Sequence, residues 1–375
     1  MRFIFMGMIL HVCWVFNLAA QNPLFTVHHS VSLKRDSLPK QEVLARLGSF
    51  LEHLNGYKKD TADTHLQQLS TAALAEEMND SGITWQVINL VRLNDSIYLI
   101  KVLAFKPSGI SGSFELIALK RMAGFCIQSP LWWKTRNWKQ QYMQGVQFYF
   151  ASEFNRSKAK QFAQIFRRFN HIMGADYRQI LFVCCDDLNE ALQMVGVHYK
   201  ASLAGYKSGS ISQKGNACLF IADGNYTSGF KAYDPHDFWH YCLYKWKPRS
   251  TWNKPVDEGC AYLYGGSWGL SWKEILQQFH RFADTTTNNN WLELYEKPFE
   301  FTGTKDKPLY VAYVLNALII QSMQSDHGLT GIRELLASGS GQNGKEHYFR
   351  ILETRTGINR MNFNSRMNDL IDKSR

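Results

Sequence analysis

Two histidines and a glutamate stand at a spacing that suits a metal ion. His236 and His240 lie four residues apart in a segment that reads as a helix, and Glu258 follows after seventeen further residues. Residues four apart share one face of a helix, so both imidazoles can reach a single ion, and a following helix can supply the carboxylate. Two histidines and one glutamate, with a fourth position left to water, form the ligand set of a hydrolytic zinc site. The sequence therefore predicts one zinc ion bound by His236, His240 and Glu258.

The residues around these ligands favour the helices that such a site requires. Asp234 is a good N-cap, and Pro235 suits the first position of a helix. A second helix is expected to start at Pro255 and to end at the paired glycines Gly265-Gly266. The segment Ser271–Glu274 has the form of a capping box and predicts the start of a third helix.

The same residues resemble the gluzincin metallopeptidases, the group that includes thermolysin and aminopeptidase N. The motif of that family is His-Glu-x-x-His, followed by a glutamate after about eighteen or nineteen intervening residues, and this chain has seventeen. The Glu-Gly-x-Ala form of the second motif is present from Glu258 to Ala261. The resemblance implies that His236, His240 and Glu258 are the zinc ligands of a peptidase that uses a metal-activated water.

The chain departs from the family at the general base. The family has glutamate directly after the first histidine, and this chain has Asp237. Aspartate is one methylene shorter, which moves its carboxylate away by roughly 1.5 Å, and a misplacement of about 1 Å can lower a rate around a hundredfold. Zinc binding does not need this residue, whereas water activation does. We expect Asp237 to act as a base that is less efficient than glutamate.

The resemblance also implies a tyrosine that stabilises the oxyanion of peptide hydrolysis. The segment 308–323 predicts a strong helix, too short and too polar to span a bilayer. Tyr310, at the start of that helix, is the first candidate for the tyrosine, and Tyr313 is the alternative. Either ring can instead be a core aromatic of a buried helix.

Strands and helices alternate upstream of the histidines. Their order resembles the N-terminal lobe of a zincin catalytic domain. In that family the last strand before the zinc helix is the sheet edge that pairs with an extended substrate, which here implies Cys218–Ala222. The expected strands are 147–150, 179–185 and 217–222, and the expected helices are 157–173 and 187–195.

Residues 22–141 have a different pattern and predict a separate α+β domain. Helical segments at 40–54 and 62–78 precede strand-like runs, an order loosely similar to the cone-shaped nuclear-transport-factor-2-like modules. The strand-like runs are 85–93, 96–105 and 113–120. We therefore expect an α+β protein, with this domain followed by a zincin-like domain at 145–285, which holds a mixed sheet and the zinc helices, and a helical lobe at 286–375.

The N-terminus has the features of an export signal. Arg2 is followed by an apolar run, Phe3 to Leu18, and by Ala19-Ala20. This pattern predicts cleavage near residue 20 and a secreted or periplasmic protein whose mature chain has no transmembrane span. Disulfides can form in such a compartment, and Cys242 and Cys260, on the two zinc helices, are candidates for a pair.

Charge and motif content narrow the class of protein. The net charge is +10, but the basic residues are spread out and no long lysine or arginine tract is present, so we expect no nucleic-acid partner. The sequence predicts a secreted zinc metallopeptidase with a peptide or protein substrate, and it leaves the oligomeric state open. Two alternatives remain: an inactive gluzincin relative that binds peptides or a partner, and an envelope-associated interaction protein that works through its N-terminal domain.

Overall fold

The computed structural model describes residues 25–29, 31, 37–56, 63–151, 153–174, 177–206, 209–223, 235–246, 251–302 and 308–375. The expected leader, residues 1–20, and Asp234 lie outside these ranges. The described chain has an α+β fold, as the sequence predicts. It divides into two compact units, one formed by residues 1–156 and 178–231 and the other by residues 157–177 and 232–375. The expected domain boundaries, 22–141, 145–285 and 286–375, do not coincide with those of the two units, and the three domains stay a prediction.

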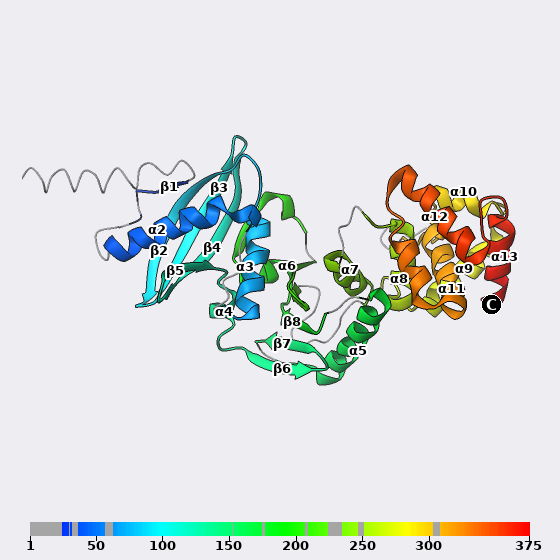
Figure 1. Ribbon diagram of the computed structural model, residues 1–375, viewed down its shortest axis with the longest axis horizontal. Helices are drawn as coiled ribbons and strands as arrows, with labels where there is room; N and C mark the ends of the chain where they lie inside the picture. The colour runs from blue at the N-terminus through cyan, green and yellow to red at the C-terminus, as the bar shows by residue number, and fades with distance from the viewer. Residues whose placement is uncertain are drawn as a thin grey trace, which may run out of the picture. The chain divides into compact units, whose positions relative to one another are not determined.

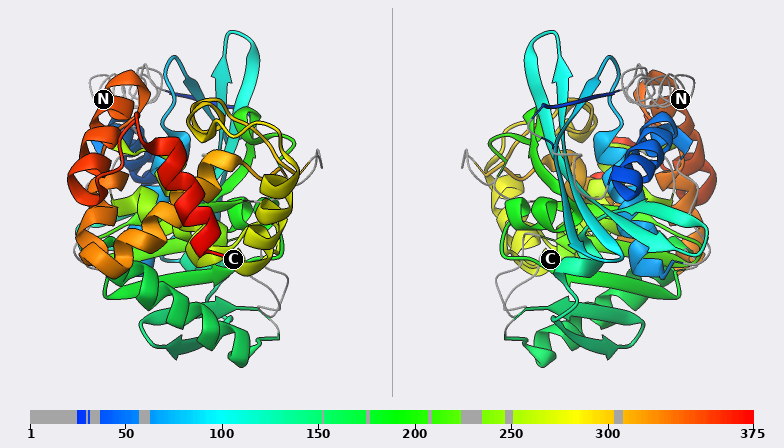
Figure 2. Two further views of the ribbon diagram at one scale, coloured as in Figure 1. Left: turned by 90° about the vertical axis from the view of Figure 1, so that its right-hand side faces the viewer. Right: turned by 90° about the vertical axis from the view of Figure 1, so that its left-hand side faces the viewer.

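The first unit contains a sheet whose longest strands, β2 to β4, are twisted and are drawn near cyan in both views of Figure 2. Neighbouring strands β2 to β5 are antiparallel, β1 pairs parallel with β2, and β9 pairs antiparallel with β4. The strands are β1 (Phe25–Val27), β2 (Thr84–Asn94), β3 (Ile97–Lys106), β4 (Gly109–Arg121), β5 (Gly124–Gln128) and β9 (Val197–Lys200). The three expected strands are confirmed as β2, β3 and β4.

Two helices contribute to the core of this sheet (Figure 1). They are α2 (Ser37–Glu52) and α3 (His65–Met78), both expected from the sequence, and a short 3-10 turn, Leu54–Gly56, lies between them. A capping box begins α3: the backbone amide of Gln67 donates to the hydroxyl of Thr64, and the amide of Thr64 donates to the Gln67 side chain.

A buried carboxylate on β4 joins three elements of this unit. Glu115 is 6% exposed, the Lys134 amine lies 2.8 Å from its Oε1, and Nε2 of His198 lies 3.4 Å from its Oε2. Burial by itself raises the pKa of Glu115, but the hydrogen bonds to His198 and Lys134 outweigh it and lower the pKa to about 2. The ion pairs therefore connect α4 (Leu131–Lys134) and β9 to β4.

The second sheet of this unit has the order β10-β11-β8-β7-β6. The three central strands are parallel to one another, and the two edge strands, β6 and β10, are antiparallel to their neighbours. The strands are β6 (Lys139–Met143), β7 (Val146–Phe150), β8 (Gln179–Cys184), β10 (Ser210–Lys214) and β11 (Cys218–Asp223). Along the chain, α5 (Arg156–Met173) follows β7, α6 (Leu188–Val195) follows β8, and a 3-10 turn (Ala201–Leu203) precedes β10.

The expected role of Cys218–Ala222 as a sheet edge is wrong. These residues form most of β11, which has β8 on one side and β10 on the other, so its backbone is paired on both sides. All six residues of β11 are buried, which explains its continuous apolar pattern. The edge strand is β10, whose mixed sequence Ser-Ile-Ser-Gln-Lys gave no strong strand signal.

The second unit is helical and includes α5. Phe162, Phe166 and Phe169 on α5 contact Phe238 on α7, and the stacked pair Phe162–Phe238 has ring centroids 4.1 Å apart. The further helices are α7 (Pro235–Trp246), α8 (Lys254–Gly265), α9 (Trp272–Thr285), α10 (Trp291–Glu296), α11 (Val311–Leu336), α12 (Gly341–Thr356) and α13 (Phe363–Lys373). The expected helix starts at Pro235, near Pro255 and at the Ser271–Glu274 capping box are confirmed.

Two glycines let α8 approach its neighbours closely. A Cβ on Gly259 would lie 2.6 Å from the Cβ of Asn316 on α11, and a Cβ on Gly265 would lie 2.6 Å from the backbone nitrogen of His236 on α7. Real Cβ atoms do not approach other atoms so closely, so these positions require glycine. The helix that carries Glu258 is therefore fixed against both the histidine helix and the long helix α11.

The helix α11 is continuous from Val311 to Leu336, so it extends well beyond the expected helix at 308–323 and contains Gly328. A single glycine inside a helix costs about 1 kcal/mol relative to alanine, which packing can outweigh. None of the described helices is long and apolar enough to span a bilayer. Cys242 and Cys260 are both buried and unpaired, so the disulfide considered from the sequence is not formed.

Candidate metal centre

The two histidines of α7 and the glutamate of α8 converge on one point. The Nε2 atoms of His236 and His240 are 3.2 Å apart, as expected for residues on one face of a helix. The Oε2 atom of Glu258 lies 3.5 Å from Nε2 of His236 and 3.6 Å from Nε2 of His240. The sequence prediction that these three side chains meet is thus realised, and together they could hold a metal ion.

The three separations fit a tetrahedral ion. Ligand atoms at zinc-ligand distances of about 2.0–2.2 Å lie about 3.3–3.6 Å from one another in a tetrahedron. The observed separations of 3.2, 3.5 and 3.6 Å match that triangle closely. The donor chemistry also fits, because two imidazoles and one carboxylate leave one tetrahedral position open. The structure shows the donor set and does not identify the metal.

Hydrogen bonds on the far side of each ring fix the imidazoles. Nδ1 of His236 lies 2.8 Å from the carbonyl oxygen of Gly266, which can only accept. Nδ1 of His240 lies 3.1 Å from Oδ1 of Asp257. Both rings therefore carry a proton on Nδ1 and, in their neutral form, direct the lone pair of Nε2 toward the shared point. This is the tautomer that a metal site needs.

Asp257 is a site residue that the sequence interpretation missed. It is 2% exposed, and its Oδ1 also accepts a hydrogen bond of 2.9 Å from the indole of Trp239. The carboxylate therefore connects the histidine helix α7 to α8 through two side chains. The only sequence signal was an acidic residue directly before Glu258, which does not by itself indicate contact with His240.

The three ligands interact strongly even without an ion. Burial by itself lowers the pKa of His240, but hydrogen bonds to Asp257 and Glu258 outweigh it and raise the pKa to about 10. Burial by itself raises the pKa of Glu258, whereas hydrogen bonds to His236 and His240 lower it far below its usual value. Both shifts have the same cause, the close approach of the His240 imidazole and the Glu258 carboxylate, whose facing atoms are 3.6 Å apart.

The ligands line a cavity of about 560 Å³. Asp237, the expected general base, lines the same cavity, and so do both candidate tyrosines, Tyr310 and Tyr313. Every residue that the sequence proposed for the site is therefore gathered around one space. The cavity is also lined by Lys254, Tyr262, Ser267, Trp268, Pro298 and Pro308.

Tyr262 is a second residue that the sequence interpretation missed. Its ring lies 5.8 Å from the ring of His236 and 5.6 Å from the ring of Tyr313, which in turn lies 5.1 Å from the ring of Tyr310. Burial raises the pKa of Tyr262 well above its usual value, so its phenol stays protonated. It lies one helical turn after Glu258, the spacing that would have identified it.

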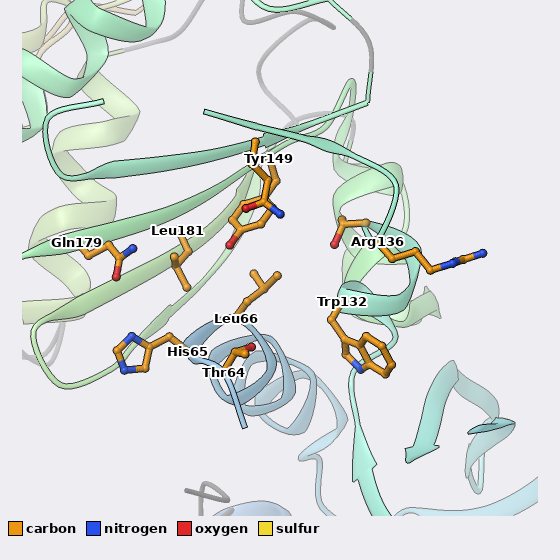
Figure 3. A pocket seen from close by; sticks show the side chains of 10 residues that line it. Thr64, His65, Leu66, Trp132, Arg136, Tyr149, Gln179 and Leu181 are labelled. Carbon is orange, nitrogen blue, oxygen red and sulfur yellow. The ribbon is translucent and has the colours of Figure 1, made fainter. Parts of the chain in front are cut away.

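A smaller cavity of about 360 Å³ lies within the first unit (Figure 3). Tyr149 and Leu181 come from adjacent strands of the second sheet, Leu66 comes from the start of α3, and Trp132 and Arg136 come from α4 and the turn after it. Arg136 stacks on the ring of Trp133, and Figure 3 shows its side chain pointing away from the cavity. The lining contains no carboxylate and no cluster of metal ligands, so this space has no evident chemistry of its own.

No protein family model matches the chain, and no curated protein matches it significantly in sequence.

Proposed function

We propose that this protein is a zinc-dependent metallopeptidase. The observation that carries the proposal is the convergence of His236, His240 and Glu258 at tetrahedral separations, with both imidazoles in the metal-binding tautomer. A zinc ion bound there would supply Lewis acidity and a water of lowered pKa. A cavity lined by an acid, tyrosines and apolar residues suits a peptide substrate.

Residues at the cavity would supply the other functions that peptide hydrolysis needs: a general base, a hydrogen-bond donor to the oxyanion and a partner that positions His240. Asp237 follows the first ligand on α7; it would accept the proton of the attacking water and return it to the amine that leaves when the peptide C–N bond breaks. Tyr310 or Tyr313 donates its hydroxyl proton in a hydrogen bond to the oxygen of the scissile carbonyl as negative charge develops there. Asp257 holds His240 in place through its hydrogen bond to Nδ1.

The arrangement of the chain supports a zincin-type fold for this function. A mixed sheet with three parallel strands precedes the histidine helix along the chain, and helices follow it. The glutamate helix packs against the histidine helix, with Gly265 against the backbone of His236. This order and packing agree with the gluzincin resemblance of the His236–Ala261 segment, and the apolar leader suits a secreted or periplasmic enzyme.

One observation favours a second candidate, an inactive relative that binds peptides or a protein partner. The residue after His236 is Asp237, whose carboxylate reaches less far than that of the glutamate in the family motif. Such a protein would keep the zinc ligands and the cavity but would not cleave a bound peptide.

Metal analysis combined with a cleavage assay tests both candidates. The full chain, purified after export, should contain one zinc per molecule by elemental analysis, and His236→Ala and His240→Ala should lose it, whereas the exposed His53→Ala should not. A peptide library should be cleaved by the zinc-loaded protein and not after treatment with a chelator. If the protein contains zinc but cleaves no peptide, the inactive binding protein is the better candidate. If the protein contains no zinc, both candidates are overturned.

A further inference from the structure

Trp268 occupies a strained turn at the metal cavity. The amide of Ser267 donates to the carbonyl of Leu270 at 3.0 Å, and the amide of Leu270 donates back at 2.8 Å, so only two residues separate the bonded pair. Those two, Trp268 and Gly269, both have positive φ, 54° and 80°. This is the pattern of a type I′ turn, which strongly prefers Asn-Gly. A bulky aromatic residue at its first central position is an outlier.

Burial does not explain the choice of tryptophan. The side chain is 46% exposed, so a large part of its ring faces solvent. Its indole nitrogen donates a hydrogen bond of 3.0 Å to the carbonyl oxygen of Pro308, which fixes the direction of the ring. A strained residue that is held in place yet exposed indicates a functional requirement rather than a packing requirement.

The ring of Trp268 belongs to an apolar part of the metal cavity. Pro298 and Pro308 line the same cavity, and the segments that carry them pair as a short ladder: Phe301 donates to Leu309 at 3.0 Å and Val311 donates to Phe299 at 3.0 Å. Because the indole N–H is already bonded to Pro308, Trp268 offers a ligand only the apolar surface of its ring.

We propose that Trp268, Pro298 and Pro308 form a subsite for an aromatic or large aliphatic side chain of the substrate, next to the bond held at the metal. The inference rests on the proposed function, and it names the class of substrate. A cationic side chain is disfavoured at the subsite, because a bound divalent ion and the amine of Lys254 would share the same cavity with it. The subsite thus selects apolar side chains by shape and by charge.

Amino-acid hydroxamates with different side chains test this subsite. The hydroxamate group of each compound binds the metal, so differences in affinity between the compounds measure how well each side chain fits the cavity. The zinc-loaded full chain is titrated with the hydroxamates of N-acetylphenylalanine, N-acetylglycine and N-acetylarginine. Partial burial of one aromatic ring should make the phenylalanine compound bind about tenfold more tightly than the glycine compound. The arginine compound should bind no better than the glycine compound.

Two substitutions of Trp268 separate its function from its structural role. Trp268→Ala and Trp268→Asn should remove the preference for phenylalanine and leave zinc content and the affinity for the glycine compound unchanged. Asparagine suits this turn, so Trp268→Asn should unfold at a temperature no lower than that of the wild type. The control is Phe299→Ala, which removes an exposed aromatic residue, 41% exposed, that does not line the cavity and should keep the preference.

The outcomes distinguish this inference from the proposed function. A protein that contains no zinc overturns the metal site and the subsite together, whereas a zinc-loaded protein that binds none of the three hydroxamates overturns the subsite alone. Zinc-loaded protein that binds the phenylalanine and glycine compounds equally, or that prefers arginine, overturns the subsite alone. The subsite is also overturned if Trp268→Asn folds and retains the phenylalanine preference.

Discussion

The imidazole of His240 and the carboxylate of Asp257 are joined by a hydrogen bond of 3.1 Å between Nδ1 and Oδ1. The two residues lie on different helices, and the same carboxylate oxygen accepts the indole N–H of Trp239. The bond fixes the orientation of the ring, so that Nε2 is the nitrogen that faces His236 and Glu258. It also makes the metal site depend on how α7 and α8 pack, and not on the three ligands alone.

Asp257→Asn should therefore weaken zinc binding without removing a ligand. Loss of such a supporting carboxylate typically lowers metal affinity 10- to 100-fold. Competition with a chelating dye measures the zinc dissociation constant, and the matched control is Asp372→Asn, at a carboxylate whose side chain is 75% exposed. If Asp257→Asn folds and binds zinc as tightly as the control variant, Asp257 has no part in holding the site.

The sequence predicted the ligands because their geometry is largely local. The spacing of His236 and His240 fixes their common face once the segment is helical, and Glu258 requires only that a second helix packs beside the first. Asp257 could not be predicted, since its contact with His240 depends on the angle between the two helices. Trp268 was missed for a similar reason: its place at the cavity depends on its bond to Pro308, forty residues away in the chain.

In the sheets too, local patterns could be predicted from the sequence and long-range pairing could not. Strands with continuous apolar or alternating patterns, such as β3 and β8, were predicted within a few residues. The strand β10 was missed because only Ile211 of its five residues is buried, so its sequence carries little strand pattern. The wrong assignment of Cys218–Ala222 as an edge came from the gluzincin resemblance, and the missed strand β10 left it uncorrected. Pairing between strands is a long-range property that the pattern of a single strand does not contain.

Gly259→Ala should destabilise the protein and disturb the site. The added methyl would meet the Cβ of Asn316 at 2.6 Å and the backbone of Ala317 and Tyr313 at 3.0 Å, and backbone atoms cannot move aside easily. Overpacking of this kind costs about 1–3 kcal/mol, and the better helix propensity of alanine offsets about 1 kcal/mol of it. Denaturant unfolding should show a net loss of up to about 2 kcal/mol, together with weaker zinc binding. Unchanged stability would contradict the close packing of α8 against α11.

The Glu115 cluster predicts sensitivity to acid. The pKa of Glu115 is lowered from 4.5 to about 2, so its contribution to stability is complete above pH 4.5 and is lost as the pH falls toward 2. Glu115→Gln should therefore destabilise the protein at neutral pH, and the difference from wild type should shrink between pH 4.5 and 2. Urea unfolding across that range measures the effect. The control is Glu293→Gln, which breaks an exposed ion pair with Lys297 that should contribute little at any pH.

Asp237 decides between an enzyme and a binding protein. If it accepts the proton of the attacking water, Asp237→Asn should abolish cleavage while zinc content stays the same, because asparagine cannot take up that proton. Asp237→Glu restores the residue of the family motif and should raise turnover, by up to about a hundredfold if reach limits the rate. Peptide cleavage at equal zinc content is the measurement. Equal turnover of the wild type and Asp237→Asn would remove Asp237 from the mechanism.

Tyr310 and Tyr313 compete for the role of hydroxyl donor to the oxyanion. Both line the metal cavity and their rings lie 5.1 Å apart, so the structure admits either residue. Loss of one such donor typically lowers turnover about 10²–10³-fold, because the developing negative charge loses a preorganised hydrogen bond. We expect Tyr310→Phe to have this effect, since Tyr310 stands before the first residue of α11 and Tyr313 packs edge-on against Tyr262.

Comparison of the two single variants assigns the donor. Phenylalanine keeps the ring and its packing, so both variants should fold and bind zinc as the wild type does, and only turnover should respond. If Tyr313→Phe loses turnover and Tyr310→Phe does not, the role belongs to Tyr313. If neither variant loses turnover in a protein that cleaves peptides, the oxyanion has no tyrosine donor, and the zinc ion must carry that charge without help from α11.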